Sequence, residues 1–86
     1  MAGVEEIRAA IVQATDKAQS GIAAITQASM QLDEAQSALL TATRGSTRAE
    51  ASQAQALLAE ALQALRGVQT TIRSSIASAE EYAERL

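Results

Sequence analysis

The chain has 86 residues, a net charge of −3, one aromatic residue (Tyr82), and no cysteine, histidine or proline. The acidic balance disfavours nucleic-acid binding, which needs a basic face for phosphates, and the missing cysteine and histidine exclude disulfides, thiolate chemistry and histidine-ligated zinc. The sequence shows no basic region followed by a long apolar run, so neither a Sec signal peptide nor a membrane span is predicted.

The first half predicts one long helix over about residues 3–43. Apolar or small residues recur at spacings of three and four from Val4 to Ala42, which is the 3.5-residue period of a coiled-coil seam. The dominant residue types lose little entropy in a helix, and no proline interrupts it. The abundant alanine, with arginine favoured over lysine, is typical of a high-GC genome such as an actinobacterial one.

A tight turn is predicted at residues 44–46, inside the stretch T-R-G-S-T-R-A-E. Gly45 suits the left-handed conformation that ends many helices, and Arg44 lies by the carbonyl end of the first helix, where a cation is favoured. Thr47 and Glu50 have the T-x-x-E spacing of a capping box. A loop this short makes the two helices antiparallel.

The second half predicts another helix over about residues 47–86, with the same heptad period. Val4 is taken as heptad position a. The residue numbers of two a residues that face each other across the hairpin then add up to a constant value, whose midpoint is the turn glycine. The d residues also face each other with a constant sum. Tyr82 then faces Ile7 as a core plug, and Gly21 receives Val68. The predicted fold is an all-α antiparallel two-helix hairpin with one domain over residues 1–86. A continuous helix is the alternative, because glycine costs only about 1 kcal/mol inside a helix.

Apolar residues outside this seam predict a second contact. Ile22, Leu62 and Ile76 fall at e positions, which meet along one edge of the pair, and Val12 and Leu40 extend that edge. A single seam between two helices buries little surface. We therefore expect the edge to pack against a second copy or a related helical hairpin, giving a four-helix bundle. Scattered surface apolar residues are the alternative.

No catalytic, metal or cofactor site is predicted, and no small-molecule substrate is expected. No carboxylate falls on an a or d position, and the histidine of di-metal bundles is missing. Membrane binding is disfavoured because the polar faces lack clustered basic residues and aromatic anchors. Acidic residues gather at the open end of the hairpin, whereas Arg44 and Arg48 lie at the turn end, and this separation can orient a partner.

The layout resembles the WXG100 (ESX-type) family of small, cysteine-poor helical hairpins that pair into four-helix bundles. The resemblance covers the whole chain and includes the central glycine, Gly45. The family's Trp-x-Gly is Thr43-Arg44-Gly45 here, and its tyrosine with an acid four residues later is Tyr82 followed by Leu86. The resemblance implies a secreted or secretion-associated hairpin without a Sec signal peptide.

The residues themselves predict a non-enzymatic protein–protein interaction module that is either a homodimer or one half of a heterodimer. A cytoplasmic location is predicted, with secretion as the alternative. Two other functional classes remain open at this point: the ESX-like exported protein, and a carrier of a small apolar ligand in a cavity left by Gly21 and the alanine layers. Tyr82 is also a candidate partner-binding hot spot.

Overall fold

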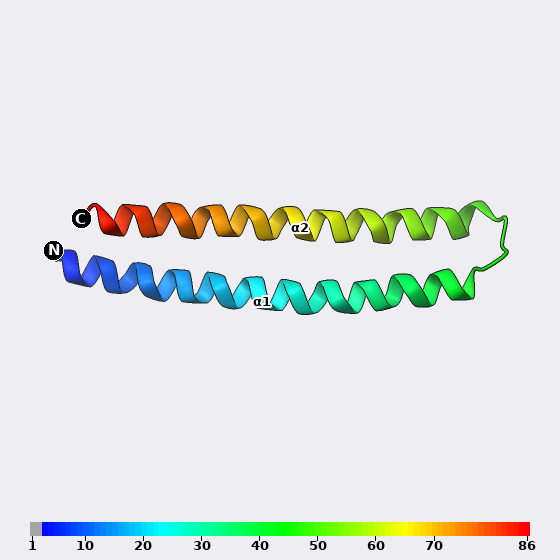
Figure 1. Ribbon diagram of the computed structural model, residues 1–86, viewed down its shortest axis with the longest axis horizontal. Coiled ribbons are helices and arrows are strands. Elements are labelled where there is room, and N and C mark those ends of the chain that lie inside the picture. Colours follow the sequence, from blue (N-terminus) through cyan, green and yellow to red (C-terminus); the bar gives the residue numbers. More distant parts are fainter. Residues whose placement is uncertain (1–2) are drawn as a thin grey trace.

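A computed structural model describes residues 3–86 and shows two long antiparallel helices joined by one turn (Figure 1). Helix α1 spans Val4–Ala42 and helix α2 spans Ala49–Glu84. The helices lie side by side along a rod that measures 64 × 17 × 16 Å. The start of α1 and the end of α2 lie at one end of the rod, called the open end, and the turn lies at the other. The predicted all-α hairpin is confirmed, and the continuous-helix alternative is wrong.

The turn begins at Thr43, the C-cap residue of α1. The N–H and the hydroxyl of Thr43 both donate to the Leu39 carbonyl, at 2.9 and 2.8 Å. Gly45 then adopts a φ of +80°, and the Ser46 N–H donates back to the Thr43 carbonyl at 2.9 Å. The prediction that Gly45 takes the left-handed conformation is therefore confirmed.

The predicted capping box is wrong, and α2 starts two residues later than expected. Arg48, not Thr47, is the N-cap residue, and no side chain caps the helix there. The Ser46 hydroxyl accepts the Arg48 N–H at 3.2 Å, and this local bond extends the turn. Thr47 therefore lies outside the helix, and Glu50 is in the first turn, where its charge complements the helix dipole. Arg44 lies just beyond Thr43, the C-cap of α1.

Replacing Gly45 with alanine is expected to lower the free energy of unfolding by about 1–2 kcal/mol, because a Cβ disfavours this φ. Gly67→Ala is the matched control. Gly67 lies inside α2 with open space around its Cβ position, so this change is expected to raise stability by up to about 1 kcal/mol. Urea denaturation followed by circular dichroism measures both. Two changes of the same sign would contradict the assigned role of Gly45.

The buried stripe is not the predicted one. Among residues 3–86, Ile22, Leu62 and Ile76 are the buried side chains, with exposed fractions of 7%, 4% and 6%. These are e positions in the predicted heptad. The a positions remain half-buried for most of both helices, whereas many d positions are exposed, including Tyr82 at 57%. The seam is thus formed by a and e, and the prediction of an a/d seam is wrong.

Side-chain size explains this rotation of both helices. Burying a leucine or isoleucine gains about 1.5–3 kcal/mol, far more than burying an alanine. The d positions hold mostly alanine, so turning each helix toward its e positions buries the larger side chains. Gly21 is not a notch for Val68, because no atom lies within 4 Å of a Cβ built on it. Tyr82 is not a core plug.

Hydrogen bonds between the helices fix their register. Arg8 Nε donates to the Ala83 carbonyl at 3.2 Å, and Gln69 Nε2 donates to the Ile22 carbonyl at 3.4 Å and to the Thr26 hydroxyl at 2.8 Å. The pairs Arg8–Ala83 and Ile22–Gln69 have the same sum of residue numbers, as one constant antiparallel register requires. In this register each buried residue lies level with a polar one. The three buried side chains therefore do not face one another across the seam, and half-buried a residues fill the space between them.

Candidate functional site

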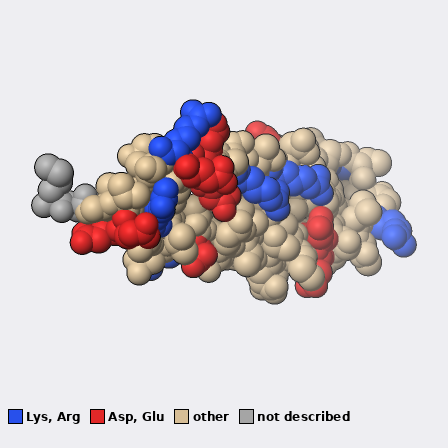
Figure 2. Space-filling view, turned by 60° about the vertical axis from the view of Figure 1, so that its left-hand side comes forward, with Lys and Arg blue, Asp and Glu red and all other residues tan. Residues whose placement is uncertain are grey.

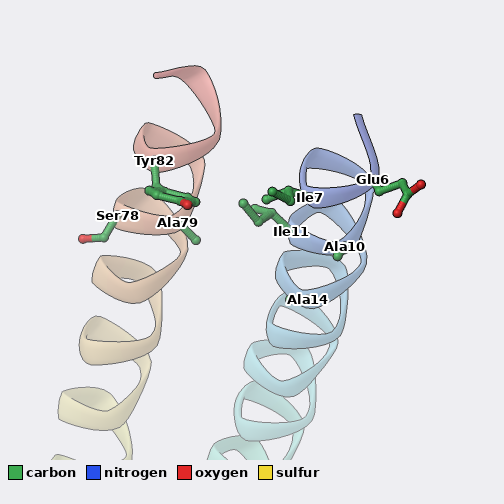
Figure 3. Close-up of a pocket in the computed structure, with 8 residues that line it drawn as sticks. All are labelled: Glu6, Ile7, Ala10, Ile11, Ala14, Ser78, Ala79 and Tyr82. Carbon is green, nitrogen blue, oxygen red and sulfur yellow. The ribbon is translucent and has the colours of Figure 1, made fainter. Parts of the chain in front are cut away.

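The hairpin carries an open apolar groove between its helices, near the open end. Its volume is about 780 Å³, and its lining residues are Glu6, Ile7, Ala10, Ile11, Ala14, Ser78, Ala79 and Tyr82. Figure 3 shows Tyr82 of α2 and Ile7 and Ile11 of α1 pointing toward one another from opposite walls. The groove exists because the d positions lie outside the buried seam and the small side chains around them leave space. Its walls are apolar, so water in it is readily displaced.

The groove is one end of a longer surface that we call the Tyr82 face. It consists of the d residues of both helices, which share one side of the seam by helical periodicity: Ile7, Ala14, Gly21, Ala28, Ala35, Ala42, Ala54, Ala61, Val68, Ser75 and Tyr82. All are exposed or half-buried, and none is charged. Val68 is 45% exposed and Tyr82 57%. Exposed apolar side chains gathered on one side of a small protein mark a candidate interaction surface.

The opposite side of the seam, the Val12 face, is polar and charged. It consists of Glu5, Val12, Gln19, Thr26, Asp33, Leu40, Ser52, Ala59, Arg66, Arg73 and Glu80. The hydrogen bond from Gln69 to the Thr26 hydroxyl joins the helices on this side. Val12 and Leu40 are exposed, at 57% and 56%. They stand apart among charged neighbours, as scattered surface apolar residues do.

The ends of the rod differ in charge. Glu5, Glu6, Glu80, Glu81 and Glu84 lie at the open end, and Figure 2 shows acidic side chains gathered there with basic ones between them. Arg8 contacts Glu5 at 3.4 Å and Arg85 contacts Glu81 at 2.6 Å. Both pairs are exposed, so each contributes at most about 1 kcal/mol. The structure gives Arg44 and Arg48, at the turn end, no ion pair within residues 3–86.

Arg8 has a second role at the open end. Its Nε–H donates to the Ala83 carbonyl in the last turn of α2, which also accepts the Leu86 N–H at 3.3 Å. A cation at this position is favoured by the helix dipole and offsets the acids that crowd the same helix end. Arg8 therefore joins the two chain ends of the hairpin.

The predicted interface residues divide into two groups. Ile22, Leu62 and Ile76 are buried inside the hairpin, so the prediction that they form an exposed edge is wrong. Val12 and Leu40 are exposed, but both lie on the charged Val12 face. The structure therefore does not bring the five residues together on one accessible surface. The apolar surface that it does expose is the Tyr82 face.

Within the described part of the chain, no group of three or more acidic, histidine or cysteine side chains is placed to hold a metal ion. Neither helix contains a stretch long and apolar enough to cross a bilayer.

A scan against protein-family models found no match, and searches of curated proteins and of solved structures likewise found none.

Proposed function

We propose that the protein is a non-enzymatic interaction module that works by self-association, with two hairpins forming a four-helix bundle. The observation that supports this proposal is the large exposed surface. The chain exposes 6337 Å². A compact protein of 8.9 kDa is expected to expose about 4,800 Å². The difference, about 1,500 Å², exceeds the roughly 800 Å² that each partner buries in a stable interface of ordinary size.

The thin core supports the same proposal. A row with three buried side chains among residues 3–86 gives little hydrophobic stabilisation to offset the entropy of ordering two long helices. Packing two hairpins together adds a second layer of burial to every helix. Association and folding would then be coupled, so the module is expected to be ordered when it is assembled.

The test is size-exclusion chromatography with light scattering, over chain concentrations of about 5–500 µM, which span the range of ordinary self-association. A species of twice the chain mass is the expected result. A helical monomer at all concentrations would contradict self-association. Native mass spectrometry of the same sample distinguishes a third case, because a bound apolar molecule in the groove would indicate a carrier instead.

The export role implied by the WXG100 resemblance is a separate proposal. It is supported by the hairpin layout and by the turn glycine in its left-handed conformation. Secretion of a tagged chain, measured with and without a co-expressed type VII secretion system, tests it. The cytoplasmic location likewise stays a prediction from the sequence.

A further inference from the structure

The proposed self-association leaves open which side of the hairpin forms the interface and in which direction the second copy runs. We propose that a second copy of this chain docks on the Tyr82 face, with the two rods antiparallel, so that the open end of each lies over the turn end of the other. This inference rests on the proposed function and adds the surface and the orientation.

The choice of face follows from charge and burial. The Tyr82 face carries no charged residue along the rod, whereas the Val12 face carries both acidic and basic side chains. Desolvating unpaired charges costs more than the contact returns, so charged residues are depleted at the centre of interfaces. The Tyr82 face also holds the apolar groove, whose walls are exposed in the single hairpin. Covering it removes apolar surface from water.

The orientation follows first from the sizes of the side chains. At the open end the Tyr82 face holds Ile7 and Tyr82, and toward the turn it holds alanines such as Ala35 and Ala54. With both open ends together, large side chains would meet at one end and alanines would face alanines at the other. Large side chains hold the two rods farther apart than facing alanines do, so straight rods would leave a gap at the alanine end. Such a gap loses packing energy. Antiparallel rods place the large side chains of each copy over the alanines of the other.

Charge favours the same orientation. The twofold axis of the antiparallel pair crosses the rods, so α1 lies over α1 and α2 over α2. Glu6, at the edge of the groove, then comes to the turn end of the second copy, near its Arg44. The acidic open end and the basic turn end approach within the range of unscreened attraction, about 10 Å at moderate salt. The parallel arrangement would instead bring two acidic ends together.

Disulfide cross-linking tests the face and the direction together, because the chain has no cysteine of its own. Ser78 and Leu57 are exposed, border the Tyr82 face on α2, and lie on opposite sides of the middle of that helix. They are about 30 Å apart along the helix, at 1.5 Å per residue, so they cannot react within one chain. The double variant S78C/L57C should form a covalent dimer, and neither single variant should do so efficiently.

The expected rate advantage of the double variant is roughly hundredfold at about 10 µM chain, because an assembled dimer holds paired thiols at an effective concentration near 1 mM. Non-reducing gel electrophoresis during oxidation by glutathione measures it. The matched control is A59C/R73C, whose sites are exposed, also on α2, and on the Val12 face. This control should react no faster than the single variants.

Each other outcome overturns the proposal in a distinct way. A dimer by light scattering, with slow cross-linking of both S78C/L57C and A59C/R73C, would overturn the antiparallel direction, because rods running in the same direction place α2 of each copy over α1 of the other. Preferential cross-linking of A59C/R73C would place the interface on the Val12 face, and the proposed self-association would stand. A monomer by light scattering, together with slow cross-linking of every variant, would overturn the proposed function itself.

A second pair of variants addresses the face without new disulfides. Ala61 lies on the Tyr82 face and Ala59 on the Val12 face, and both are exposed. A61E should lower the dimer fraction in light scattering by at least about tenfold, since it buries an unpaired charge, whereas A59E should leave it unchanged. Equal dimer fractions for A61E and A59E would overturn the assignment of the face.

Discussion

Replacing Leu62 with alanine is expected to lower the free energy of unfolding by about 2–5 kcal/mol, the usual cost of truncating a buried leucine. Leu62 is the most buried side chain among residues 3–86, at 4% exposure, and the register places it level with Ser29. Alanine would leave a void that neither helix can close without moving along its whole length. Because the buried row has so few members, this one loss approaches the total stability of a small domain.

Urea denaturation at fixed chain concentration measures the effect. The matched control is Leu40→Ala, in α1, where the side chain is 56% exposed and the change should stay within about 0.5 kcal/mol. Equal losses from the two leucines would show that the a/e seam is not the core. A harsher version replaces both Ile22 and Leu62 with glutamate. That variant should lose its helical circular dichroism altogether, because two unpaired charges would be buried.

The hairpin itself could be predicted from the sequence because its signals are local or periodic. The unbroken heptad predicts two helices, and Gly45 marks the one position among residues 3–86 that takes a positive φ. The equal lengths of the halves then place the helices in antiparallel register. None of these inferences depends on which side chains are finally buried.

The seam could not be predicted because three heptad positions compete for it. Positions a and d hold apolar or small residues throughout, so they form the more regular pattern. Position e holds a few large apolar residues, such as Ile22 and Leu62, among polar ones such as Ser29 and Gln69. Counting apolar residues at each heptad position favours d as the second seam position. The free energy of burial depends on side-chain area instead, and so it favours e. The groove beside Tyr82 was missed for the same reason.

Polar residues inside the seam add to this difficulty. The Ser29 hydroxyl and the Gln55 side-chain nitrogen are buried without a hydrogen-bond partner in the described structure. Such atoms lower stability, and a sequence pattern gives no reason to expect them in a core. Gln69 shows the opposite case, because its amide donates to the Thr26 hydroxyl of the other helix. The predicted start of α2 was wrong for a similar reason. The hydrogen bond from the Arg48 N–H to the Ser46 hydroxyl is a local alternative to the capping box, and the T-x-x-E spacing cannot exclude it.

The midpoint of thermal unfolding is expected to rise with protein concentration, because the thin core couples folding to association. For two chains of 86 residues unfolding together, the enthalpy is about 120 kcal/mol at roughly 0.7 kcal/mol per residue. A hundredfold increase in concentration should then raise Tm by about 8 °C. Circular dichroism in cells of different path length measures Tm from micromolar to submillimolar chain. The A61E variant is the control, since without a dimer its Tm should be lower and independent of concentration. A constant Tm for the unmodified chain would mean that one hairpin folds by itself, and that its exposed Tyr82 face contributes nothing to its stability.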